Sequence, residues 1–205
     1  MMLACTGPAV TPVPGMEIIE QGRNGEFLVA TDVDWSKYKK FQLEKATVTF
    51  REKWVHDQRT RSGITVREKD EERIKSILAD LLDEALKREL SSGAGFVYTD
   101  ESGADVMRFQ PRVVKLDIIA PDRVRDYIGY SLTDSQGNMT LELEIYDSLN
   151  GKLLVTARQY QEDTYKGYME WTTSGTNRTA FRLMLLRWTS WLAEKFEETK
   201  TGTPD

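Results

Sequence analysis

The sequence predicts an α+β fold, a two-layer sandwich in which a mainly antiparallel sheet of about four to five strands carries two long helices on one face. Two helical apolar stripes, at residues 74–90 and 181–196, and one strictly alternating segment, at residues 139–146, predict it. The segments follow one another as strand, helix, three strands and helix. Because both stripes need an apolar surface to cover them, we expect the helices to share the sheet.

The first helix is predicted from apolar residues that recur every three or four positions: Ile74, Ile77, Leu78, Leu81, Leu82, Ala85, Leu86 and Leu90. Residues 65–68 have the form of a capping box, and Gly93 is placed to end the helix. The second helix is predicted from a similar apolar face: Phe181, Met184, Leu185, Trp188, Trp191, Leu192 and Phe196. Each helix therefore has one buried face.

The strands are predicted from β-branched and alternating residues. Residues 41–50 indicate the first strand, and residues 106–119 indicate a later one whose alternation changes phase near Pro111, which predicts a bulge or bend there. Residues 139–146 alternate cleanly, and residues 147–151 predict a turn into a returning strand. The first strand, the first helix and the next long strand are expected to form one crossover unit.

Length and composition predict one packed domain at residues 35–200, preceded by a lipid-anchor region and flexible tether at residues 1–34. The chain has 205 residues, of which 40% are hydrophobic. Its net charge of −5 and sequence pI of about 5.2 disfavour a nucleic-acid partner. No apolar run approaches the roughly 18 residues that a transmembrane helix needs.

The only cysteine, Cys5, follows Met2-Leu3-Ala4 and precedes a segment rich in Pro, Gly and Thr. A small residue, a cysteine and such a tether resemble the junction at which bacterial lipoproteins are cleaved and acylated. We therefore expect acylation of Cys5, which requires a signal peptide with an apolar stretch of roughly 7–15 residues before the cleavage site. The alternative is a free cysteine in a disordered N-terminus.

Three segments, in this order and spacing, are similar to the bacterial lipoprotein family DUF3313, a domain of unknown function: residues 35–40 (Trp-Ser-Lys-Tyr-Lys-Lys), 142–154 and 187–193. The resemblance runs from about Asp34 to Phe196. It implies a Gram-negative envelope lipoprotein with a signal peptide and an acyl chain such as palmitate on Cys5, and it implies no activity. Thr6 after the cysteine fits the usual sorting pattern for the outer membrane, so we expect anchoring on its periplasmic side.

No motif indicates an enzyme, and we expect no catalytic residue, metal or cofactor. His56 is the only histidine, and one histidine with one cysteine cannot complete a zinc shell. Glu142 and Glu144 share a strand face at a spacing that suits glycoside hydrolysis. That face is opposite the apolar one, so we expect them to pair with Arg or Lys on neighbouring strands instead.

Tyr165, Tyr168 and Trp171 form the candidate partner-binding segment, because aromatic side chains with polar tips are favoured at interfaces. The alternative is that Trp171 caps the edge of the sheet. We expect a non-enzymatic envelope component that binds the membrane through its lipid anchor and an unknown envelope protein or the cell wall through its domain. A binding module for a small apolar or lipidic ligand between sheet and helices is the runner-up. A carboxylate-based hydrolase is third.

Overall fold

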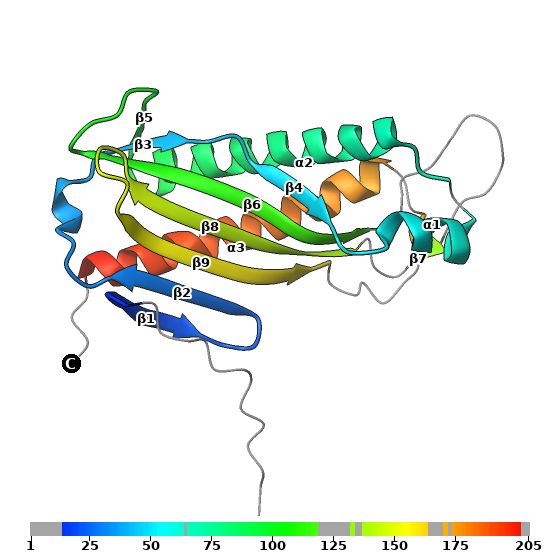
Figure 1. Cartoon of the computed structure of the whole chain (residues 1–205), viewed down its shortest axis with the longest axis horizontal. Coiled ribbons are helices and arrows are strands. Elements are labelled where there is room, and N and C mark those ends of the chain that lie inside the picture. Colours follow the sequence, from blue (N-terminus) through cyan, green and yellow to red (C-terminus); the bar gives the residue numbers. More distant parts are fainter. Residues whose placement is uncertain are drawn as a thin grey trace, which may run out of the picture.

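The computed structural model describes residues 14–63, 65–118, 132–133, 137–163, 170–171 and 174–201 (Figure 1). Its strands are β1 (Met16–Gln21), β2 (Gly25–Ala30), β3 (Lys40–Leu43), β4 (Thr47–Phe50), β5 (Val97–Tyr98), β6 (Val106–Ile118), β7 (Leu132–Thr133), β8 (Gly137–Asp147), β9 (Leu153–Glu162) and β10 (Glu170–Trp171). Its helices are α1 (Trp54–Ser62), α2 (Glu68–Arg88) and α3 (Ser174–Thr201), with a 3₁₀ turn η1 (Trp35–Lys37) and a π-helical turn η2 (Glu89–Gly93).

The main sheet has the strand order β1-β2-β9-β8-β6-β3-β5, and β4 also pairs with β6. The pairs from β1 to β6 in this order are antiparallel, whereas β3 and β4 run parallel to β6, and β5 runs parallel to β3. The predicted fold class is therefore wrong in its counts. The described chain has a mixed, mostly antiparallel sheet of eight strands with three α-helices, in place of four to five strands with two helices.

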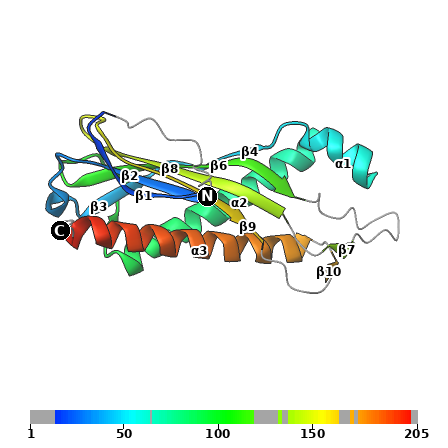
Figure 2. The same ribbon diagram turned by 90° about the horizontal axis from the view of Figure 1, so that it is seen from below.

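Both long helices lie behind the sheet in Figure 1, and Figure 2 shows α3 running along its lower side. The inward residues of β8 are Met139, Leu141, Leu143 and Ile145, each with no exposed surface. They belong to one core cluster with the α2 residues Leu78 and Leu82 and the α3 residues Met184 and Trp188. The predicted alternation and both helical stripes are confirmed, and burial of these large side chains holds the layers together.

The change of phase in β6 comes from Lys115, four residues after the predicted position. Lys115 has a left-handed φ of 53°, and the pairing of β6 with β8 shifts register between Val114 and Asp117. This is a β-bulge, since one extra residue resets which side chains face the core. Pro111 instead lies within continuous β6–β8 pairing.

Pro111 is accommodated because its side of β6 faces a break in the neighbouring strand. The Phe109 carbonyl accepts from the backbone N–H of Glu44 at 2.9 Å, and the Val113 carbonyl accepts from the Thr49 hydroxyl at 3.5 Å. Backbone groups alternate sides along a strand, so the Pro111 nitrogen faces that same edge. Residues 44–46, between β3 and β4, do not pair with it. The predicted strand at residues 41–50 is accordingly two strands.

The ends of α2 follow the sequence only in part. The helix begins after Arg67, whose backbone N–H donates to the Asp70 carboxylate at 3.2 Å, so the predicted capping box at residues 65–68 is displaced by two residues. At the other end, η2 carries the helix on to Gly93, where the sequence predicted its end.

Two pairs of strands form in segments for which the sequence predicted no strand. β1 and β2 lie before the predicted domain start at residue 35, and β2 pairs with β9 in the main sheet. β7 and β10 form a separate two-stranded sheet. Their apolar patterns are too short to predict a strand on their own.

Leu82 tests the core directly, because its side chain has no exposed surface. Leu82→Ala should lower the free energy of unfolding by about 2–5 kcal/mol through lost burial and a residual cavity. Glu84→Ala, at an exposed position of the same helix, should change it by less than about 0.5 kcal/mol. Urea unfolding of both variants measures the difference, and equal losses would contradict the position of α2 against the sheet.

Candidate functional site

A pocket of about 360 Å³ opens at the end of the molecule where η1 approaches the loop before β5. We call it the end pocket. Its lining is Trp35, Ser36, Tyr38, Lys39, Ala94, Gly95 and Phe96. The volume falls within the range of small-ligand sites, and the lining combines aromatic walls with a few polar groups, as such sites do.

One wall is fixed by the turn that η1 makes. The Asp34 carboxylate accepts from the Ser36 backbone N–H at 3.0 Å and from its hydroxyl at 2.6 Å, which caps the turn. The rings of Trp35 and Tyr38 then lie 6.3 Å apart between centroids. Trp35 is half-buried and packs against the core, so this wall is anchored to the sheet.

The other wall is the segment that leaves η2 and enters β5. Gly95 has a φ of +72°, a conformation that favours glycine, and a Cβ there would meet no atom within 4 Å. The turn brings Phe96 back, where its N–H donates to the Leu90 carbonyl at 2.9 Å. Val97 N–H donates to the Lys39 carbonyl at 3.0 Å, which joins the two walls.

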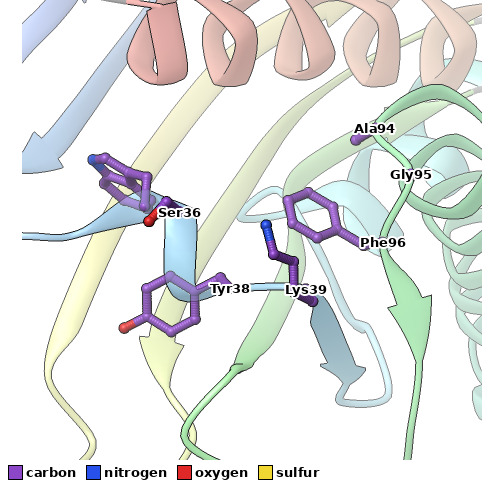
Figure 3. Close-up of a pocket in the computed structure, with 7 residues that line it drawn as sticks. Ser36, Tyr38, Lys39, Ala94, Gly95 and Phe96 are labelled. Carbon is purple, nitrogen blue, oxygen red and sulfur yellow. The ribbon is translucent and has the colours of Figure 1, made fainter.

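Lys39 supplies the charge of the end pocket. Its backbone is held by the Asp105 carbonyl at 2.9 Å, and its side chain is exposed. Figure 3 shows the Lys39 side chain and the Phe96 ring extending into the same space, while the Tyr38 hydroxyl points away from it. Within the described residues, the Lys39 amine has no ion-pair partner, so the pocket presents a positive charge beside its aromatic walls.

Asp147 ties η1 to the turn between β8 and β9. Its carboxylate, 4% exposed, accepts from the Tyr38 hydroxyl at 2.8 Å and from the Lys37 amine at 3.1 Å. Burial alone would raise the pKa of Asp147, but these bonds and the N–H groups of Asn150 and Leu149 outweigh it and lower the pKa from 3.8 to about 2. Burial raises the pKa of the Tyr38 hydroxyl. The network is structural and sets the position of the η1 wall.

The residues proposed from the sequence for lipidation and partner binding fall largely outside the described chain. Cys5, Tyr165 and Tyr168 lie outside the described residues. Trp171 is placed only by its backbone, in β10, where it pairs with Leu132 of β7. The acylation of Cys5 and the aromatic binding segment stay predictions.

The two strand carboxylates are engaged in ion pairs on the outer face of the sheet, as predicted. The guanidinium of Arg112 lies 3.4 Å from the Glu142 carboxylate and 2.9 Å from the Glu144 carboxylate. The guanidinium of Arg158 lies 3.6 Å from the Glu142 carboxylate. Arg112 and Arg158 lie directly across from Glu142 on the two neighbouring strands. His56 lies exposed on α1.

The described residues offer neither a metal site nor a membrane-spanning helix. They contain no cluster of three or more His, Cys, Asp or Glu side chains placed to hold a metal ion. None of the helices in that part of the chain has the length and apolar character needed to cross a membrane.

The end pocket was not predicted from the sequence, because its walls come from segments that are far apart in the chain. The signal that could have indicated it is the interleaving of aromatic and basic residues at Trp35, Lys37, Tyr38 and Lys39. Phe96 has no comparable signal in the sequence, because its place in the pocket depends on the turn at Gly95.

The Asp147 network predicts a specific loss of stability in acid. The pKa of Asp147 is lower in the folded protein, about 2, than in the unfolded chain, where it is 3.8. The carboxylate therefore stabilises the fold fully above about pH 4, and this stabilisation is lost as the pH falls toward about 2. The shift corresponds to about 2 kcal/mol. Asp147→Asn should therefore cost about 2 kcal/mol or more at neutral pH, and the gap to the parent protein should narrow in acid. Urea unfolding across this pH range measures it, and a gap independent of pH would refute the role of the carboxylate.

Comparison with solved structures finds distant likenesses. Protein XCC0632 from Xanthomonas campestris is 12% identical with a TM-score of 0.44, covering 76% of this chain and 82% of that one. PelC from Paraburkholderia phytofirmans is 13% identical with a TM-score of 0.36, covering 82% and 97%. A candidate lipoprotein from Caulobacter crescentus is 10% identical with a TM-score of 0.40, covering 83% and 98%. These scores are too low to carry an argument about function.

Sequence comparison gives a firmer result. No curated protein sequence matches the chain. The model of the family described as "Protein of unknown function (DUF3313)" matches residues 20–173, which include both walls of the end pocket and the Asp147 network. The match covers most of the chain and agrees with the resemblance seen in its residues. The chain belongs to the DUF3313 family.

Proposed function

We propose that the protein is a non-enzymatic lipoprotein of a Gram-negative envelope, anchored through acylated Cys5 on the periplasmic side of the outer membrane, and that its end pocket binds an envelope protein. The Ala4-Cys5 junction, Thr6 and the Pro-rich tether support the anchor. The single observation that carries the binding role is the Lys39 amine, unpaired in the described chain, between the Trp35 and Phe96 walls.

The neighbouring edge strand favours a protein as the partner. β5 is the last strand of the sheet order, and Val97 is 61% exposed. The N–H groups of Val97 and Thr99 donate to the carbonyls of Lys39, just before β3, and of Phe41 in β3, so the backbone groups of Tyr98 face the open edge. An extended segment could pair with that edge and place an acidic residue beside Lys39. Cell-wall binding is the alternative outcome of the test below.

The lipid anchor predicts incorporation of a fatty acid. Expressed from the full gene with its signal peptide, the protein should take up labelled palmitate, and Cys5→Ser should abolish the label and leave uncleaved precursor. Metabolic labelling followed by electrophoresis measures both. Label that persists in Cys5→Ser would refute acylation at this residue.

The pocket predicts loss of partner capture without loss of folding. Lys39→Glu should reduce capture from envelope extracts by at least about tenfold, since it places like charges together. Trp35→Ala should reduce capture by a similar factor through the lost aromatic wall. Lys69→Glu, at an exposed position of α2, is the matched control and should leave capture unchanged.

Melting temperatures of the variants separate binding from stability, and sedimentation with purified cell wall separates the two partner classes.

A paired variant, Tyr168→Ala with Trp171→Ala, tests the aromatic segment predicted from the sequence. Capture that survives Lys39→Glu and Trp35→Ala but fails in this paired variant would refute the end pocket and support that segment. Lys39-dependent binding to the cell wall alone would refute a protein partner.

A further inference from the structure

The two long helices present different outer faces. The exposed residues of α2 are polar or charged: Glu68, Lys69, Glu72, Arg73, Ser76, Asp80, Glu84, Lys87 and Arg88. On α3, by contrast, Leu183 is 44% and Leu186 is 46% exposed. In Figure 2, α3 forms the lower border of the ribbon, with the sheet on its other side. An ordinary solvent face explains α2 but not α3.

The exposed leucines belong to a continuous stripe along α3. Its residues are spaced alternately four and three apart, which is the spacing of a helix-pairing seam: Thr179, Leu183, Leu186, Ser190, Ala193 and Glu197. Five of them are exposed, and Ala193 is half-buried. Among its four central residues, the two leucines lie in the N-terminal half, and the small residues Ser190 and Ala193 lie in the C-terminal half.

This order fits a second copy of the same helix running in the opposite direction. With a twofold axis near residue 188, Leu186 would face Ser190 of the second copy, and Leu183 would face Ala193. Large side chains then pack against small ones on both sides of the axis, as a self-complementary interface requires. A parallel arrangement would place leucine against leucine and leave the small residues apart.

The charges along α3 also complement one another across an antiparallel pair. Arg178 and Arg182 are exposed in the N-terminal half, whereas Glu194, Glu197 and Glu198 are exposed in the C-terminal half. In the register set by the leucines, Arg182 is level with Glu194 of the second copy and lies within one helical turn of Glu197. Opposite charges therefore meet at both ends of the seam, and like charges would meet in a parallel pair.

Near the twofold axis, this register would bring Arg187 of one protomer close to Arg187 of the other. Its guanidinium donates to the Glu162 carbonyl at 2.7 Å and to the Gln161 side chain at 3.3 Å. These bonds hold the group toward β9, so the like charges near the axis are directed apart. The stripe itself contains no positively charged residue.

From these observations we propose that the outer face of α3 is the interface of a homodimer, in which two copies of α3 pack antiparallel about a twofold axis near residue 188. The interface is a single helix pair, so it belongs at the small end of specific interfaces, and association in the micromolar range is expected. The inference is independent of the proposed function, because the end pocket does not use these residues.

Sedimentation velocity of the full chain tests the proposal. The protein carries Cys5→Ser, so that neither an acyl chain nor a disulfide can join two copies. It should sediment as a dimer that dissociates on dilution between about 100 and 1 μM. A monomer throughout this range would overturn the proposal.

A charge exchange tests the register. Arg182→Glu should weaken the dimer at least about tenfold, because it places two acidic groups together at each end of the seam. Adding Glu197→Arg should restore association to within about threefold of the parent. The two positions lie 15 residues apart on one helix, about 22 Å, so they cannot compensate within one chain. Arg73→Glu on α2 is the matched control and should have no effect.

Circular dichroism should show that each variant is folded, because all substituted positions are exposed. A dimer that Arg182→Glu leaves intact would overturn the α3 interface. A dimer that Arg182→Glu weakens and the exchange fails to restore would overturn the antiparallel register.

Discussion

Burial of the inward face of the central strands is the interaction on which the rest of the structure depends. β6 and β8 carry fully buried side chains on this face, and both α2 and α3 contribute to the same core cluster. The opposite face is consequently polar, with Arg112 and Arg158 paired to Glu142. With one sheet face filled by helices and the other by ion pairs, the remaining features of functional interest lie at the end of the sheet and on the outside of α3.

The position of the end pocket follows from the same constraint. The space between sheet and helices is occupied by Trp188, Phe109, Leu82 and their neighbours, so the pocket forms where the layers end. Its η1 wall is set by Asp147, whose carboxylate is satisfied by hydrogen bonds from four groups. Lys39 differs because its amine has no ion-pair partner in the described chain, although the groups around it are firmly held.

The parts of the fold that the sequence predicted are those with a long, regular period. The stripe on α2, the stripe on α3 and the alternation of β8 each include four or more buried residues at a fixed spacing, and all three are confirmed. Strand number was underestimated because β1, β2 and β5 are six residues or fewer and lack such a pattern. The β-bulge was assigned to Pro111 because proline is visible in a sequence, whereas the left-handed φ of Lys115 is not.

The candidate site could not be predicted in the same way, because it is assembled by the turn at Gly95 and the capped turn at Asp34 from separate segments. Site-specific photo-crosslinking in living cells tests its role most directly. A photoreactive residue at position 35 should form an adduct with one envelope protein, and this adduct should disappear when Lys39→Glu is added. Adducts that form from position 168 but not from position 35 would contradict the end pocket as the binding site.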